Sequence, residues 1–286
     1  MKRILITFVI SLPFVTGCRS DKNDKFILDP PAENVFQYST LRVMSNIWED
    51  NTVTDSIKFD FDLEKVSARD SISTFKLTYR DFTWKRPALR ITINNGDFNE
   101  TNEMVHAINV IDSMGFFLKG ESIEVIMNQS GKVLDVRGID ELLDRVAMAA
   151  RLEKRFLKMS IADHISVAAV TDFLSILFSP VPGKKVQEAE KWYPAVTLIS
   201  KAPIRISNIF QLDNISGDTA LIKIRALVSA QQSQGGNVYL KGEQTGIAKL
   251  SFTTGMPYLY ETKTESIYTT GANSYRKSEY LFLQKK

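Results

Sequence analysis

Apolar and polar side chains alternate residue by residue over most of both ends of this chain. The alternation is clear from Ser56 to Leu63, within a stretch of β-branched and aromatic residues that runs from 35 to 93. It returns in five later segments, at residues 204–212, 220–229, 246–252, 258–269 and 275–283. Because successive side chains of a strand point to opposite faces, this period predicts antiparallel strands with one buried face.

The middle of the chain follows the helical period instead. Residues 101–113 form a predicted amphipathic helix, and residues 122–136 form a predicted hairpin around an Asn/Gln/Ser/Gly turn. Two further helices are predicted over residues 140–159 and 162–178, the second ending before Pro180. This order predicts an α+β fold: a large antiparallel sheet, flat or curved, with the amphipathic helix and a central helix pair packed on it.

A short apolar leader opens the chain. Lys2 and Arg3 precede an apolar run over residues 4–14, which is too short to cross a hydrocarbon core of about 30 Å as a stable helix. Cys18 is the single cysteine and follows this run closely. We therefore predict a signal peptide over residues 1–17 rather than a membrane-spanning anchor.

The sequence Val15-Thr16-Gly17-Cys18 resembles the bacterial lipobox, which a lipoprotein peptidase recognises. That resemblance implies cleavage before Cys18, a diacylglycerol on its sulfur, and binding to a membrane through this N-terminal lipid. It also implies the outer membrane, because an aspartate after the cysteine commonly retains lipoproteins at the inner membrane and this chain has Arg19. The inner membrane is the less favoured location.

Polar residues ending in Pro30-Pro31 follow the cysteine, and this composition predicts a flexible tether over residues 18–33. The remaining residues, 34–286, are enough to bury the core of a single α+β domain. The alternative division has two β-rich halves, 34–137 and 184–286, around helices within 140–178.

The mature chain is close to electrical neutrality. The whole sequence has 36 lysines and arginines against 33 acidic residues, and the leader contains two of the cations and no acid. Without a basic excess to meet a phosphate backbone, we expect no nucleic-acid partner. With Cys18 acylated, no thiol remains for a disulfide, a metal site or a nucleophile. The common motifs for cofactors, metals and acyl-enzyme chemistry are missing, so we predict no cofactor, no metal and no catalytic residue.

Two polar residues are candidates for the wall of a cavity. Glu153 falls on the apolar face of the first helix of the pair, where an unpaired carboxylate is costly. His164 begins a polar stripe on the very apolar second helix. The alternatives are a bend or cover by Arg145 for Glu153, and a polar stripe on a buried helix for His164. The other histidine, His106, is predicted to face solvent.

Asp60, Asp62 and Glu64 place three carboxylates on one face of a predicted strand. Such a series could bind a hard cation, but a calcium site needs about 6–8 oxygens that converge from a curved loop. A solvated strand face is therefore the preferred interpretation.

Two segments bounded by glycines carry a wider resemblance. They run from Gly120 to Gly138, through the predicted hairpin, and from Gly246 to Gly255. With these segments, residues 35–283 resemble an uncharacterised family of bacterial lipoproteins. The Gly-Asp-x-Trp turn expected for that family corresponds here to Ala189-Glu190-Lys191-Trp192. The resemblance assigns no catalytic residue.

These features lead to three hypotheses. The first is a non-catalytic, lipid-anchored protein of the cell envelope that binds an unknown protein partner or ligand. The second is a periplasmic carrier or binder of hydrophobic small molecules, because a very apolar helix is predicted beside a sheet. The third, a hydrolase, is the least favoured, because helical geometry would separate His164 from Ser175 by about 16 Å.

Overall fold

The computed structural model describes residues 25–32, 34–48, 51–85, 114–162, 164–199, 203–232, 238–270 and 273–286. Several predictions lie outside these residues: the signal peptide with Val15, Thr16 and Gly17, the lipidated Cys18, the helix over 101–113, and His106. Among the helices of the described ranges, none combines the length and the apolar character needed to cross a membrane.

Most of the described chain forms one antiparallel sheet of twelve strands. In chain order these are β2 (Val35–Trp48), β3 (Asn51–Arg69), β4 (Ile72–Lys85), β5 (Ser122–Asn128), β6 (Val133–Arg137), β8 (Lys191–Trp192), β9 (Ala195–Leu198), β10 (Ile204–Ser216), β11 (Thr219–Gln232), β12 (Val238–Ser251), β13 (Pro257–Thr270) and β14 (Asn273–Lys285). Across the sheet the order is β6-β5-β4-β3-β2-β14-β13-β12-β11-β10-β8, and β9 also pairs with β10. This confirms the predicted fold class, in which a large antiparallel sheet carries few helices.

The first and last strands of this sheet in chain order, β2 and β14, are neighbours in its middle. β2 pairs with β14 along a register that runs from Tyr38 opposite Lys285 to Ile47 opposite Arg276. The strands before the helices and the strands after them are therefore joined by backbone hydrogen bonds. The two β-rich halves of the sequence form one continuous sheet.

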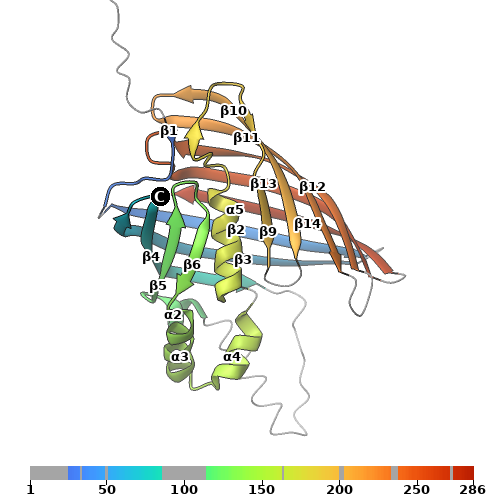
Figure 1. Ribbon diagram of the computed structural model, residues 1–286. Coiled ribbons are helices and arrows are strands. Elements are labelled where there is room, and N and C mark those ends of the chain that lie inside the picture. Colours follow the sequence, from blue (N-terminus) through green and yellow to red (C-terminus); the bar gives the residue numbers. More distant parts are fainter. Residues whose placement is uncertain are drawn as a thin grey trace, which may run out of the picture.

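The sheet curves into a trough whose buried face is concave (Figure 1). Gly242 and Gly246 lie on this face of β12, at the same parity as the buried Gln244 and Ala248. A Cβ atom on either glycine would collide with the backbone of β13. The missing side chains therefore allow β13 to lean over β12, which is how glycines commonly bend a sheet.

Four helices accompany the sheet in the described ranges: α2 (Met114–Leu118), α3 (Ile139–Ala150), α4 (Lys154–Ile161) and α5 (Val167–Phe178). The single helix predicted over 140–159 is two helices, because Arg151 adopts a left-handed conformation (φ 52°) that ends α3. α5 also begins later than predicted, where the Ser166 hydroxyl accepts a hydrogen bond from the Ala169 backbone N–H at 3.1 Å.

α5 lies inside the trough and spans it from one edge towards the other (Figure 1). It contacts β6 at one edge of the sheet, β9 near the opposite edge, and β13 between them. The buried Asp172 of α5 accepts the backbone N–H of Ile199 with both carboxylate oxygens at 3.0 Å, just after β9 ends. The helix is thus held as a roof over part of the concave face.

Residues 25–32 pack against the domain. β1 (Lys25–Phe26) pairs with β7 (Lys184–Lys185), and the exposed fractions of Phe26 and Leu28 are 0% and 1%. Gly255 makes this approach possible, because a Cβ atom there would lie 2.6 Å from the carbonyl oxygen of Ile27. The flexible tether predicted over 18–33 is therefore wrong for residues 25–32. The polar composition of residues 18–33 does not reveal that two apolar side chains, Phe26 and Leu28, are buried in the core.

One end of the trough is closed by turns. Backbone hydrogen bonds join Leu28 to Gln129, Asp29 to Thr254, and Gln129 to Ser71, so the N-terminal segment and the turns β3–β4, β5–β6 and β12–β13 meet there. We call this the closed end. Large buried side chains fill the core, including Phe26, Phe61, Phe75, Phe178, Phe210 and Tyr260. The opposite end, where β2 leads to β3 and β13 to β14, is called the far end.

Candidate functional site

The trough contains a cavity of about 380 Å³ towards its far end. α5 crosses the strands (Figure 1), so along their direction it covers only the width of one helix, about 10–12 Å, whereas β2, β3 and β10–β14 have 13–19 residues at about 3.3 Å each. The helix therefore roofs only part of the concave face. Small-molecule sites in proteins commonly enclose about 300–1,000 Å³, so this cavity has the size of a ligand site.

One wall of the cavity is apolar. The inward-facing residues of three neighbouring strands form it: Ile204, Ile206, Val228, Ala230 and Leu240. Three of them, Ile206, Val228 and Leu240, belong to a buried cluster that is distinct from the main core. Ile176 of α5 and Leu198 of β9 complete this side. A hydrocarbon chain could lie against this wall without leaving a polar group unpaired.

The neighbouring wall, built by β12, β13, β14 and β2, is polar. Gln244 donates a hydrogen bond to the Thr264 hydroxyl at 3.1 Å, and Ser266 adds a second hydroxyl to the lining. Arg42, Lys277 and Glu279 line the same cavity. The cavity is therefore amphipathic, with an apolar side on β10–β12 and a polar side on β12–β14 and β2.

Glu279 lies between two cations on the polar wall. The Arg42 Nε and Nη2 atoms are each 3.0 Å from Glu279 Oε1, and the Lys277 Nζ atom is 3.5 Å from Oε2. Only 19% of the Glu279 side chain is exposed. Burial alone would raise the pKa of Glu279, but Arg42 and Lys277 outweigh it and hold the pKa below its usual value. At neutral pH these three residues therefore carry one excess positive charge.

Arg42 also borders a second, smaller cavity of about 50 Å³ beneath α5. Apolar side chains of β3, β4 and α5 surround it, among them Ile57, Phe59 and Val170. His164 lines both cavities, and its ring stands edge-on to Trp84 with the ring centroids 4.4 Å apart. Of the two predicted cavity residues, His164 is thus placed at the site, on the loop before α5.

Aromatic rings mark the far end of the cavity. Tyr268 of β13 and Tyr275 of β14 line it, with ring centroids 4.9 Å apart. Trp48, the last residue of β2, lies 5.2 Å from Tyr275 by the same measure. Such rings give an apolar body and a polar edge to the boundary between cavity and solvent.

Glu153 lies outside both cavities. It precedes the first turn of α4 with 60% of its side chain exposed, and the Arg155 Nε atom is 2.7 Å from its Oε2. The expectation that Glu153 faces a cavity assumed one continuous helix, and the break at Arg151 turns the residue towards solvent. Arg145, the alternative cover for Glu153, pairs with Glu121 at 2.6 Å instead.

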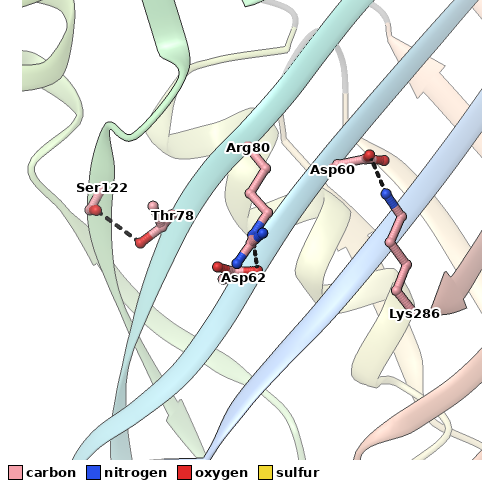
Figure 2. A network of polar contacts seen from close by, with 6 residues as sticks. All are labelled: Asp60, Asp62, Thr78, Arg80, Ser122 and Lys286. Carbon is pink, nitrogen blue, oxygen red and sulfur yellow. Dashed lines mark hydrogen bonds and ion pairs between the residues drawn. The ribbon is translucent and has the colours of Figure 1, made fainter.

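The convex face of the sheet carries cross-strand polar pairs (Figure 2). Asp60 accepts a hydrogen bond from Lys286 at 2.5 Å, and Asp62 accepts one from Arg80 at 2.5 Å. Two carboxylates of the series on β3, Asp60 and Asp62, are thus engaged by cations. Across the ranges that the structure describes, no group of three or more His, Cys, Asp or Glu side chains is arranged to hold a metal ion.

Arg42, Lys277 and Glu279 are not among the site residues predicted from the sequence. The signal for them is parity: Arg42 shares the inward face of β2 with Phe36 and Tyr38, and Lys277 and Glu279 share that of β14 with Leu281 and Leu283. A charge at a core-facing position breaks the binary pattern of a strand. Sequence alone does not show that β2 and β14 are neighbours.

A family model described as a family of unknown function, DUF6263, matches residues 70–257 of this chain. The chain belongs to this family. The matched range includes both segments on which the resemblance to an uncharacterised family was based, Gly120–Gly138 and Gly246–Gly255. Among curated proteins, none matches the chain by sequence.

Two solved structures align with most of this chain. A structure described as "Lipid-protein interactions in lipovitellin" has 9% sequence identity and a TM-score of 0.47, and the match covers 90% of this chain and 25% of that chain. An outer-membrane channel from Pseudomonas putida F1 has 6% identity and a TM-score of 0.20, with 91% and 97% covered. This chain spans about a quarter of the lipovitellin chain. Neither likeness is close enough to inform function.

Proposed function

We propose that this protein is a lipid-anchored protein of the cell envelope that binds a hydrophobic or amphipathic small molecule in the trough. The observation that carries the proposal is the amphipathic cavity of about 380 Å³ on the concave face. Of the hypotheses drawn from the sequence, this favours the binder or carrier of hydrophobic ligands. No chemical step is proposed, and the role of the site is to hold and release its ligand.

The contrast between the two ends of the trough supports a binding role. The core is filled by large side chains such as Phe75 and Phe210, both with 0% exposure. Towards the far end β10 presents Ile206 in place of an aromatic residue such as Phe210, and together with Val228 and Ala230 of β11 it leaves space. Interiors normally pack without voids of this size, so the space indicates a site that a ligand fills.

The anchoring part of the proposal rests on Cys18 and the residues Val15, Thr16 and Gly17. We propose acylation of the Cys18 sulfur and placement at the outer membrane, with the binding domain held close to the bilayer. Six residues separate Cys18 from Lys25, where the packed N-terminal segment begins. Even fully extended, that connection spans only about 23 Å.

Native mass spectrometry of the protein purified from the envelope of its own host tests the binding role. We expect a fraction of the protein to carry a small molecule that tandem dissociation identifies as a lipid or another long-chain compound. Protein that shows only its own mass, before and after incubation with an extract of the host's lipids, would contradict the proposal.

Replacement of Cys18 with serine tests the anchor. We expect the Cys18→Ser variant to lose metabolic labelling by a radioactive fatty acid and to leave the outer-membrane fraction, since acylation requires the sulfur. A variant that is still labelled, or that fractionates as the wild type does, would show that Cys18 is not the site of lipidation.

A further inference from the structure

We infer that the cavity takes a single-chain amphiphile whose anionic head group lies against Lys277 and Arg42. This inference rests on the proposed binding function and adds the chemical class of the ligand. It begins from the charges on the polar wall, where Arg42 and Lys277 flank the one carboxylate of Glu279.

The two cations of this wall, Arg42 and Lys277, share the single negative charge of Glu279. Arg42 directs both Nε and Nη2 to the same oxygen of Glu279, and Lys277 lies 3.5 Å from the other oxygen, which is long for a charged hydrogen bond. A partly desolvated excess cation is unfavourable unless an anion meets it. Lys277 can therefore donate to an oxygen of a bound carboxylate or phosphate.

Neutral donors lie next to Lys277. Ser266 of β13 stands directly opposite Lys277 in the strand register, and Thr264 stands opposite Glu279. Both hydroxyls line the cavity: the Thr264 hydroxyl accepts from Gln244 and can donate to an oxygen of the same head group, whereas the Ser266 hydroxyl donates to the backbone carbonyl of Lys277 at 3.4 Å. Asp55 of β3 lines the cavity beyond β2, so it repels an anion from that side. The head group is thus placed on the β13–β14 side of Arg42.

The tail has an apolar surface within reach of this position. The β10–β12 wall presents Ile206, Val228 and Leu240 to the cavity, and no charged residue of these three strands lines it. A volume of about 380 Å³ is at the low end of the range for ligand sites, which favours one acyl chain over two. One chain with one anionic end is the shape that these walls complement.

Opposite effects of two neutral replacements test the inference. We would displace the uncharged fluorophore N-phenyl-1-naphthylamine with dodecanoate, dodecyl phosphate and uncharged 1-dodecanol, and repeat this with Lys277→Gln and Glu279→Gln. Lys277→Gln should lower the affinity for the two anions by about ten-fold. Glu279→Gln should raise the affinity for the same anions, because it removes the competing carboxylate. In both variants the affinity for 1-dodecanol should change much less than the affinity for the two anions.

Lys249→Gln is the matched control, because Lys249 is exposed on the convex face and its replacement changes the net charge equally. The preferred anion identifies the head group as carboxylate or phosphate. The inference would be overturned if the wild type bound the anions and 1-dodecanol with equal affinity, or if Lys277→Gln lost affinity for the anions and for 1-dodecanol equally. Either result would leave the binding function intact. Failure of the wild type to bind the fluorophore or any of the three amphiphiles would contradict the binding function itself. If Glu279→Gln fails to fold, Lys277→Gln against Lys249→Gln still decides the question.

Discussion

At the scale of single residues, backbone conformation explains a departure from the expected family pattern. Ala189 occupies the first position of the expected Gly-Asp-x-Trp turn and adopts a φ of 64°, in the left-handed region. Its backbone N–H donates to the carbonyl of Leu212 at 2.8 Å, which holds the turn next to β10. Trp192, at the end of the turn, is buried against Phe210. The turn therefore requires a left-handed backbone conformation, which favours glycine, although this chain has alanine at the position.

Replacing Ala189 with glycine should therefore stabilise the protein. A non-glycine residue in the left-handed region costs about 1–2 kcal/mol, and the added freedom of glycine in the unfolded chain returns part of the gain. We expect the free energy of unfolding, measured by urea denaturation, to rise by about 0.5–1 kcal/mol. Ala149→Gly, at an exposed position of α3, should have the opposite sign. A loss of stability in Ala189→Gly would contradict the assigned backbone conformation.

Asp218 stabilises the closed end in its ionised form. It accepts hydrogen bonds from the Ser251 hydroxyl at 2.7 Å, the Thr253 backbone N–H at 2.9 Å and the Tyr258 hydroxyl at 2.9 Å. Burial raises the pKa of Asp218, but these hydrogen bonds outweigh burial and lower it below its usual value. The stabilisation is therefore present above the unfolded pKa of about 3.9 and is lost as pH falls through the folded value.

We predict that Asp218→Asn lowers the free energy of unfolding at pH 7 by about 1 kcal/mol, a small figure because Asp218 is exposed. The difference from the wild type should shrink as pH falls below about 4, because the wild-type carboxyl then also becomes neutral. Urea denaturation at pH 7 and at pH 3 measures both values. A difference that is constant with pH would show that the charge of Asp218 plays no part.

At the scale of elements, strands were predictable from alternation, but apart from the hairpin β5–β6 their partners were not. The segments from Ser56 to Leu63 and from 275 to 283 show the period clearly, and both are strands. The first half of β12 was not predicted, because Gly242 and Gly246 interrupt its pattern, yet these glycines are what bends the sheet. The helix over 140–159 was over-extended because a periodicity argument does not detect a left-handed residue at Arg151.

A side chain at Gly246 should disturb the curvature. We predict that Gly246→Ala destabilises the protein by about 1–3 kcal/mol, because its Cβ atom would collide with the carbonyl oxygen of Glu261 in β13. Thr245→Ala, on the convex face of the same strand, should change stability by less than about 0.5 kcal/mol. Thermal unfolding of both variants provides the comparison. Equal stability of the two would contradict the close approach of β12 and β13.

The N-terminal segment should behave as part of the core. Leu28→Ala is expected to lower the free energy of unfolding by about 2–5 kcal/mol, because Leu28 is 1% exposed. Leu227→Ala is the matched control, since Leu227 is 59% exposed on the convex face. If both replacements have the same small effect, residues 25–32 belong to a tether after all.

At the scale of the whole molecule, the strand periods predicted the sheet, whereas the cavity depends on how the sheet closes. His164 was recognisable as a polar residue beside an apolar helix, and it lines the site. Arg42 and Glu279 are 237 residues apart in sequence, so only the pairing of β2 with β14 shows that they form an ion pair. Curvature, roof and charge cluster together create an amphipathic site that none of the segments contains alone.

Filling the cavity is the most direct test of this account. We would measure the dissociation constant of N-phenyl-1-naphthylamine by fluorescence for the wild type, for Val228→Trp combined with Ala230→Trp, and for Leu227→Trp. Val228 and Ala230 line the cavity, whereas Leu227 directly precedes Val228 and lies on the convex face of the same strand. The account predicts that the double variant, folded by circular dichroism, binds at least about ten-fold more weakly while Leu227→Trp binds as the wild type does. Equal binding by all three proteins, or no binding by the wild type, would contradict it.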